Sequence, residues 1–299
     1  MGVLGAGTMA PGIAAAFAGA GHPVRLWARS AERARAAAAR ARELAAFLVE
    51  HRLAASPAAI EPARELEELS GAGVVVEAIA ESLDAKQDLF GRVEAVVGEG
   101  TLLASTTSGL RVADLAARVR RPERVVAMHF WNPAHLMPLV EVAGERASRA
   151  SIDRAMALSR AIGKVPVLLE REVLGFLGVR LQQAVVREAI ALVEAGVASA
   201  EDIDLAVRTS FGIRFPVIGP LESADLTGLD VIEAIHGYLL ADLDRSTEPQ
   251  AALRSRVAAG DLGSKSGRGF HDWTRRDAAA TMRARDDELV RRLQRELVA

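Results

Sequence analysis

The segment that decides the fold is VLGAGTMA at residues 3–10, where a short apolar strand runs directly into a glycine turn. Gly5, Gly7 and Ala10 have the Gly-x-Gly-x-x-Gly/Ala spacing that joins a strand to a helix in dinucleotide-binding folds. The first glycine permits the tight turn, the second lets the backbone approach a pyrophosphate, and the third small residue allows close helix–strand contact. N–H groups at the start of the helix then face the phosphates. The spacing predicts a phosphate-binding turn formed by Gly5, Gly7, Thr8, Met9 and Ala10.

Short apolar runs alternate with helical segments over the first 170 residues. Strands are predicted at 3–4, 24–28, 73–80, 102–105 and 124–130, helices at 11–20, 31–50, 85–97 and 112–119, and a loop at 56–62. Ser30 is a favourable N-cap for the second of these helices. Such alternation is typical of a parallel sheet with helices on both faces. We therefore predict an α/β fold, with a Rossmann-type doubly wound sheet over residues 1–170.

The pattern changes near residue 170. The remaining chain shows helical periodicity at 176–195, 200–209, 228–243 and 277–297, and no strand signal. No low-complexity linker separates the two parts. We predict an all-helical C-terminal domain over residues 171–299, in which the Leu/Val/Ala stripe of helix 176–195 forms core or a dimer face.

Composition excludes several classes of protein. The chain has 299 residues, half of them apolar, which is enough for two domains, and its net charge is only −2. A net charge this small gives no electrostatic basis for binding nucleic acid. Without cysteine there is no disulfide, no thiolate metal site and no cysteine nucleophile, which is compatible with the cytoplasm. No apolar run reaches the ~18 residues of a membrane span. We expect no nucleic acid, membrane or metal partner, and a cytoplasmic location.

The end of the second predicted strand bears on the choice of dinucleotide. NAD-binding proteins usually carry an acidic residue there, which binds the ribose hydroxyls. This chain has Ala28 followed by Arg29. A 2′-phosphate would meet no repulsion and could bind the Arg29 guanidinium. The sequence favours NADP slightly over NAD, with a solvated Arg29 as the plainer alternative.

The candidate chemistry lies in HFWNPAHLMPLVEV at residues 129–142. His129 is at the end of a predicted strand, and Glu141 lies on the next extended segment. An imidazole accepts a proton near neutral pH, and a carboxylate beside it holds the reactive tautomer. Ser108 follows strand 102–105, at the carboxyl edge of the sheet where ligands bind in such folds. The plainer alternatives are a structural histidine and a helix-capping serine.

Several motifs together resemble the 3-hydroxyacyl-CoA dehydrogenase family, which includes relatives acting on L-gulonate and carnitine. The motifs are GAGTMA-PGIA at 5–14, VVEAIAESLDAK at 75–86, STTSGL at 105–110, HFWNPAHLMPLVEV at 129–142 and GSKSGRGFHDW at 263–273. The resemblance implies that His129 is the base, Glu141 its partner, and Ser108 a contact to substrate and cofactor. It also implies cofactor contacts from Glu81, Lys86, Asn132 and Lys265, and a homodimer formed by the helical domain.

The chain departs from the family pattern near the predicted substrate. Val179 stands where the family has an asparagine that contacts the substrate, and the segment 30–70 is shorter than in acyl-CoA enzymes. The leading hypothesis is a 3-hydroxyacyl-CoA dehydrogenase of fatty acid metabolism. The first alternative is a dehydrogenase of a small polar 3-hydroxy acid, which the segment GIRFPVIGPLE at 212–222 also resembles. The second is a nucleotide-binding protein without turnover, with a structural or sensing role.

Overall fold

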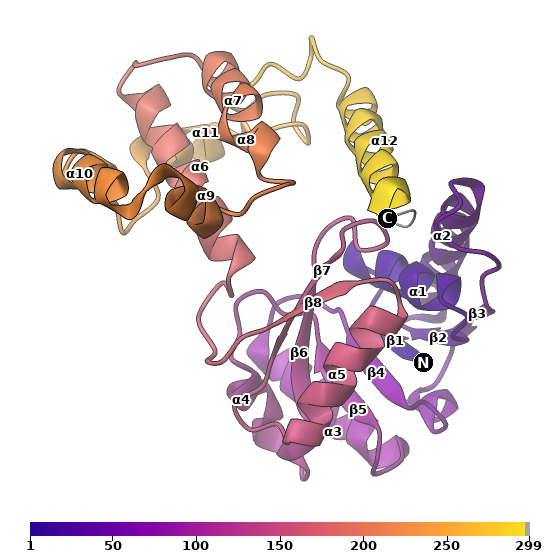
Figure 1. The fold of residues 1–299 in the computed structure, drawn as a ribbon. Coiled ribbons are helices and arrows are strands. Elements are labelled where there is room, and N and C mark those ends of the chain that lie inside the picture. Colours follow the sequence, from indigo (N-terminus) through magenta and orange to yellow (C-terminus); the bar gives the residue numbers. More distant parts are fainter. Residues whose placement is uncertain (297–299) are drawn as a thin grey trace. The chain divides into compact units, whose positions relative to one another are not determined.

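Eight strands form one sheet in the computed structural model, which describes residues 1–296 (Figure 1). In spatial order the sheet reads β3-β2-β1-β4-β5-β6-β7-β8, and every pairing is parallel except β6 with β7. The strands are β1 Gly2–Leu4, β2 Val24–Trp27, β3 Ile60–Ala63, β4 Val74–Glu77, β5 Leu102–Ser105, β6 Val125–Phe130, β7 Leu139–Ala143 and β8 Val165–Leu168. The predicted doubly wound α/β fold is confirmed.

The chain divides into two units. The first, called the sheet unit below, comprises Met1–Arg180 and the C-terminal segment from Ala284 onward. The second, called the helical unit, comprises Leu181–Arg283. Residues 297–299, the end of the last predicted helix and domain, lie outside the described residues. Within residues 1–296, no helix has the length and apolarity needed to cross a lipid bilayer.

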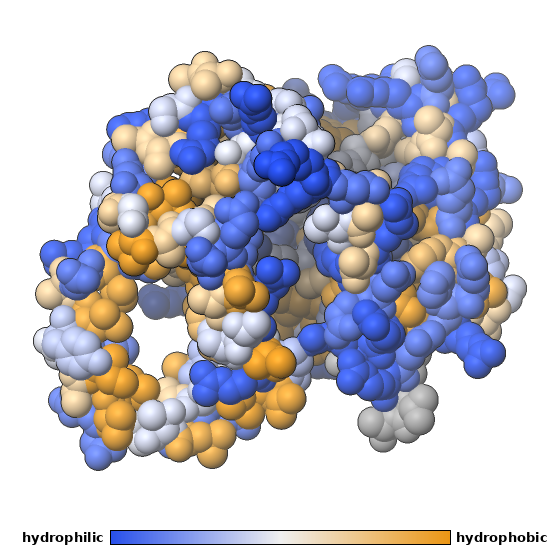
Figure 2. All heavy atoms as spheres, turned by 90° about the horizontal axis from the view of Figure 1, so that it is seen from above, coloured by the Kyte–Doolittle hydropathy of each residue, from blue (hydrophilic) through white to orange (hydrophobic). Residues whose placement is uncertain are grey.

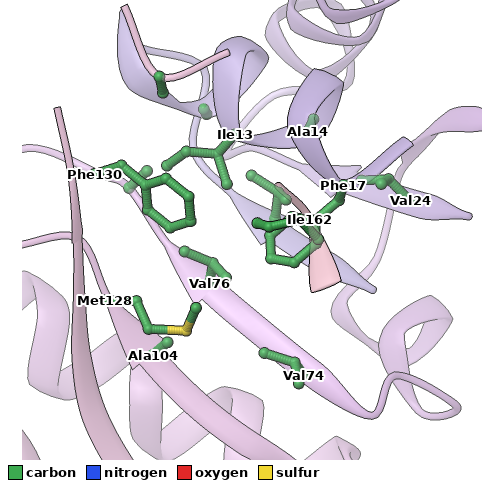
Figure 3. Close-up of a cluster of buried hydrophobic side chains, with 14 of the residues drawn as sticks. Ile13, Ala14, Phe17, Val24, Val74, Val76, Ala104, Met128, Phe130 and Ile162 are labelled. Carbon is green, nitrogen blue, oxygen red and sulfur yellow. The ribbon is translucent and has the colours of Figure 1, made fainter. Parts of the chain in front are cut away.

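Helices cover both faces of the sheet, and each face has its own apolar core. One face carries α1 Met9–Gly19, α2 Ala31–Glu50 and α5 Arg149–Ala161, and the other carries α3 Leu83–Val96 and α4 Val112–Leu115. In the first core, Ile13 and Phe17 of α1 point toward Val76, Met128 and Phe130 of the sheet (Figure 3). Serine N-caps begin three of these helices, as predicted for Ser30, whose hydroxyl accepts the Arg33 N–H at 3.2 Å.

The helical unit has little core of its own. Its helices are α6 Gly178–Glu194, which begins in the sheet unit, and α7 Ala200–Thr209, α8 Phe211–Arg214, α9 Pro220–Thr227, α10 Leu229–Leu239 and α11 Ala251–Ala258. Among the described residues, Ile190 of α6 is buried and α7 to α11 contribute none. The last helix, α12 Ala278–Glu296, lies in the sheet unit from Ala284 onward, and there its Val290 packs against Leu48 and Leu136.

Three features of the sheet differ from the sequence prediction. The end of the predicted loop 56–62 is wrong, because Ile60–Ala63 forms β3 at one edge. The sheet is not wholly parallel, because β7 reverses against β6. Helix α5 and the other edge strand, β8, had no predicted counterpart. Both edge strands contain a proline, Pro62 or Pro166, which masks a strand signal because proline cannot donate a ladder hydrogen bond.

Candidate active site

The glycine turn lies where the strand order reverses. From β1 the chain runs outward to β2 and β3 and then returns to β4 on the other side of β1, which is the position where doubly wound sheets bind ligands. Gly5 has φ +131°, and a Cβ there would lie 2.5 Å from the Ala78 carbonyl oxygen. A Cβ at Gly7 would meet nothing within 4 Å. The turn therefore requires glycine at position 5 for the fold, and leaves open space at position 7 for a ligand.

A groove of ≈ 480 Å³ extends from this turn. Its described lining includes Thr8, Met9, Ala28 and two arginines, Arg29 and Arg33, and no acidic residue. Ala10 is fully buried beneath the turn, in the apolar core. The groove and the N-terminus of α1 together have the size and the N–H groups that a dinucleotide requires.

His129 and Glu141 form a direct cross-strand pair. They face each other in the antiparallel register of β6 and β7, and His129 Nδ1 lies 2.8 Å from Glu141 Oε2. Glu141 accepts three further hydrogen bonds, from Trp131 Nε1 at 3.0 Å and from the backbone N–H groups of Leu177 at 2.8 Å and Gly178 at 3.0 Å. Burial raises the pKa of Glu141, but the hydrogen bonds from His129, Gly178, Trp131 and Leu177 outweigh it and lower the pKa to about 2.

The charge of Glu141 fixes the tautomer of His129. An ionised carboxylate can only accept hydrogen bonds, so the proton of a neutral imidazole lies on Nδ1 and the lone pair on Nε2. Among residues 1–296, no hydrogen bond to Nε2 is present, and Arg124 Nε is the one fully buried side-chain nitrogen without a partner. His129 Nε2 therefore has no hydrogen-bond partner among these residues, and His129 as a whole is 6% exposed. The ring of Phe176 stacks on the imidazole with centroids 5.4 Å apart.

The loop carrying Ser108 is held by a single carboxylate. Glu81 accepts hydrogen bonds from the Thr107 hydroxyl and from the backbone N–H groups of Ser108 at 3.2 Å and Gly109 at 3.1 Å. Burial raises the pKa of Glu81, but the Thr107 hydroxyl and the nearby Lys86 ammonium outweigh it and lower the pKa. The Ser108 side chain is exposed at this end of the sheet. The structure thus brings the Ser108 loop and Glu81 together.

Lys86 is buried rather than open to a ligand. Its ammonium lies 2.8 and 2.9 Å from the Glu77 carboxylate oxygens and 3.2 Å from Glu81 Oε2. Ser105 Oγ also donates to Glu77, at 2.6 Å. A direct contact of Lys86 with a cofactor stays a prediction, and in the structure Glu77 and Glu81 bind its ammonium. The ion pair with Lys86 helps to hold Glu81 in position. Sequence reasoning missed Glu77, because an acid inside an apolar strand gives no signal without knowledge of its lysine partner.

The segment after β6 is fixed from two sides. Lys164 Nζ donates to the carbonyl oxygens of His135 at 3.3 Å and Met137 at 2.9 Å. A Cβ built on Gly12 of α1 would lie 3.1 Å from Ala134 Cβ, so the helix and this segment touch through small residues. Burial lowers the pKa of His135 to about 4, so its imidazole is a weaker proton acceptor than an unperturbed one. Asn132 is exposed at the start of this segment.

Two predicted residues lie farther along the chain. Val179 is the second residue of α6 and is half-buried. Lys265 is exposed in the helical unit, in a loop closed by bridges between Gly263 and Arg268 and between Arg268 and Asp272. Roles for both toward substrate or cofactor stay predictions.

The doubly wound sheet, the glycine turn and the His129–Glu141 pair are together typical of oxidoreductases that bind a dinucleotide. Residues 1–173 match the NAD-binding domain model of 3-hydroxyacyl-CoA dehydrogenase, and residues 175–273 match the model of its C-terminal domain. The chain belongs to the 3-hydroxyacyl-CoA dehydrogenase family, as its motifs indicated. Members of this family are NAD-dependent oxidoreductases that act on CH–OH groups.

Individual relatives differ in the substrate that their names give. The chain is 34% identical over 297 residues to a 5-formyl-3-hydroxy-2-methylpyridine 4-carboxylate 5-dehydrogenase of Mesorhizobium japonicum, covering 96% of this chain and 95% of that one. A solved structure of a dehydrogenase of this name, described as an NAD⁺-dependent dismutase, has TM-score 0.91 and 32% identity, covering 97% of this chain and 95% of that one. An (S)-3-hydroxybutyryl-CoA dehydrogenase from Ralstonia eutropha has TM-score 0.73 and 32% identity, covering 91% and 98%.

Proposed function

We propose that this protein transfers a hydride between a nicotinamide dinucleotide and a carbon bearing a hydroxyl group, with His129 as the base. The observation that carries the proposal is an imidazole whose Nδ1–H is bound by an ionised, buried glutamate and whose Nε2 has no hydrogen bond within residues 1–296. In oxidation, the O–H bond of the alcohol breaks and its proton goes to His129 Nε2. The bound nicotinamide supplies the hydride acceptor for the electron pair of the C–H bond. In reduction, the imidazolium returns the proton.

The other predicted site residues fit this chemistry as contacts and supports. Glu141 holds the imidazole and stabilises its charged form. Ser108 is a contact to substrate or cofactor, on a loop that Glu81 fixes. Gly5, Gly7, Thr8, Met9 and Ala10 hold the cofactor phosphates, and Asn132 and Lys265 are further proposed cofactor contacts.

Two classes of substrate remain as candidates. An acyl-CoA agrees with the family name and with relatives such as the 3-hydroxybutyryl-CoA dehydrogenase, and would place the protein in fatty acid metabolism. A small polar acid is supported by Val179, which cannot donate the hydrogen bond of the usual asparagine. It is also supported by the higher TM-score to the enzyme named for a pyridine carboxylate, 0.91 against 0.73. We favour the small polar acid, because a missing donor costs about 1–3 kcal/mol for a substrate that requires it.

The test is nicotinamide reduction or oxidation by the wild type, His129→Ala and His236→Ala with three kinds of substrate. These are 3-hydroxybutyryl-CoA, free hydroxy acids such as carnitine and L-gulonate, and an aromatic aldehyde acid. We expect His129→Ala to lower kcat by ~10²–10⁴-fold. His236, exposed on α10, is the matched control and should have no effect. Tight cofactor binding without turnover of any substrate would support the non-catalytic alternative instead.

For the cofactor, we propose that the groove accepts NADP at least as well as NAD, because Arg29 and Arg33 line it and Ala28 replaces the usual acid. The relative described as NAD⁺-dependent supports NAD as the other candidate. Thermal shifts with each dinucleotide report the affinities, since a ligand that binds only the folded state stabilises it. Arg29→Asp should move the preference toward NAD. An unchanged ratio of the two affinities in this variant would refute a role for Arg29.

We also propose that the helical unit forms a homodimer. Its helices expose large apolar side chains, including Val217, Leu221 and Leu226, which are 74–83% exposed. Apolar side chains are visible on the surface of this unit in Figure 2. Surfaces of this kind are typical of obligate subunit interfaces. A second copy of the same chain is the proposed occupant, in accordance with the predicted family resemblance.

A further inference from the structure

Trp131 shares a carboxylate oxygen with the proposed base. Its indole Nε1–H donates to Glu141 Oε2 at 3.0 Å, and His129 Nδ1 lies 2.8 Å from the same oxygen. The other oxygen, Oε1, accepts the N–H groups of Leu177 and Gly178. Four donors therefore surround a carboxylate that is 0% exposed. All four stabilise the same negative charge, so the loss of one donor leaves more of that charge to the other three.

The indole occupies space that a side chain at position 178 would need. A Cβ built on Gly178 would lie 2.4 Å from Trp131 Cζ2 and 3.2 Å from Cε2 and Cη2. Gly178 has no positive φ, so its backbone conformation would accept any residue, and alanine is the better helix former at this first position of α6. The absence of a side chain at 178 is thus required by Trp131, and the two positions act as one unit.

We propose that Trp131, seated against Gly178, is a positioning residue that sets the proton affinity of His129 through Glu141. The indole N–H takes part of the negative charge of Oε2 and fixes its direction toward the imidazole. This inference rests on the proposed function of His129 as base. Among residues 1–296, Glu141 is the one titratable group that hydrogen-bonds or ion-pairs with His129, and the aromatic rings of Phe176 and Trp131 are its close ring neighbours.

The expected direction follows from the charge. Trp131→Phe keeps an aromatic ring and removes the N–H donor, so Glu141 Oε2 keeps more negative charge for the Nδ1–H of His129. The imidazolium is then more stable, and the pH of half-protonation of His129 rises. A hydrogen bond to an ionised group is stronger than one between neutral groups, but only part of its energy reaches the imidazole. We expect a rise of about 0.5–1 pH unit.

The test uses two readouts on the full-length protein. NMR titration of the His129 imidazole, assigned with His129→Asn, needs no turnover and reports the proton affinity directly. The pH profile of kcat/KM for oxidation should show its acidic limb moved upward by the same amount in Trp131→Phe. Trp273→Phe, in the helical unit, is the matched control and should change neither readout. An unchanged or lowered titration midpoint in Trp131→Phe overturns the proposal.

A double-mutant cycle tests the coupling of the two positions. Gly178→Ala should push the indole from Glu141, move the titration midpoint upward as Trp131→Phe does, and lower kcat/KM by about tenfold or more. The same alanine in the Trp131→Phe background should cost less than about threefold, because the clashing atoms are gone. Additive effects overturn the coupling. If the wild type turns over no substrate while the NMR midpoint still moves as expected, the proposed function fails and the positioning role stands.

Discussion

The two units of this chain bury their apolar residues to very different degrees. In the sheet unit, strands β1, β4, β5 and β6 are buried at every position, and two separate cores fill the faces of the sheet. In the described part of the helical unit, α7 to α11 bury no residue. The sheet unit therefore has its own source of stability. The helical unit leaves many large apolar side chains exposed, which is the observation behind the proposed homodimer.

The largest expected effect concerns the buried carboxylate of the sheet unit. Glu141→Gln removes the negative charge that four hydrogen-bond donors face. The NH₂ group of the new amide would also face one pair of these donors, where it cannot accept a hydrogen bond. We expect kcat to fall by ~10²–10⁴-fold, since the imidazole loses both its tautomer and its counter-charge. Steady-state kinetics measure it, with circular dichroism as the check on folding. Glu145→Gln, an exposed carboxylate of the same unit, is the control, and equal losses in the two variants would remove the special role of Glu141.

The next prediction distinguishes, within the glycine turn, the residue needed for stability from the residue needed for dinucleotide binding. Gly5→Ala places a Cβ 2.5 Å from a carbonyl oxygen at φ +131°, and we expect a loss of about 3 kcal/mol, or roughly 6–12 °C in Tm. Gly7→Ala meets no atom within 4 Å, so Tm should stay unchanged while dinucleotide affinity falls. Thermal melts and calorimetric titration distinguish the two. A Gly7→Ala variant with full affinity would contradict the proposed place of the pyrophosphate.

A third experiment addresses the partner of the helical unit. Val217→Lys places a charge on a side chain that is 83% exposed, where only a covering subunit would be disturbed. We expect sedimentation velocity to show monomer at concentrations where the wild type is dimeric, and a lower Tm that depends on concentration. Val165→Lys, at an exposed apolar position on β8 of the sheet unit, is the counterpart and should leave the dimer intact. A monomeric wild type would refute the homodimer.

The smallest expected effect is in acid. The pKa of Glu141 is lowered in the folded state to about 2 from 4.5, so its contribution to stability is present above pH 4.5 and is lost as the pH falls toward 2. Glu141→Gln should flatten the fall of unfolding free energy in that window. The pKa values of Glu201 and Asp272 in the helical unit are also lowered, by hydrogen bonds from His271 and Thr274, but these groups are exposed. Salt should screen their contribution and leave that of Glu141.

Most of the sheet unit could be predicted from the sequence, because most of its strands are short apolar runs with clear ends. The helical segment 200–209 and the strand 102–105 were predicted to the residue. Strand direction could not be read, because alternation of side chains is the same in parallel and antiparallel strands, so the reversal of β7 was not foreseen. The short edge strand β3, with proline and glutamate inside it, has no apolar run to detect.

Site residues could be predicted where one motif contains them, and could not be predicted where they come from segments far apart in the chain. His129 and Glu141 were expected on neighbouring segments, and the structure pairs them directly. The donors from Leu177 and Gly178 come from 36 and 37 residues away in the chain, and no local pattern indicates them. Trp131 was not singled out from the sequence, because no local pattern indicates that its indole bonds to Glu141. The burial of Lys86 against Glu77 required knowledge of the sheet order.

The contact between Gly12 and Ala134 connects the helix that follows the phosphate turn with the segment that follows the proposed base. Helix α1 begins at the phosphate turn and touches, one turn later, the backbone that follows His129. A bulkier residue at position 12 would spread the helix from that backbone and disturb both ends of the hydride path at once.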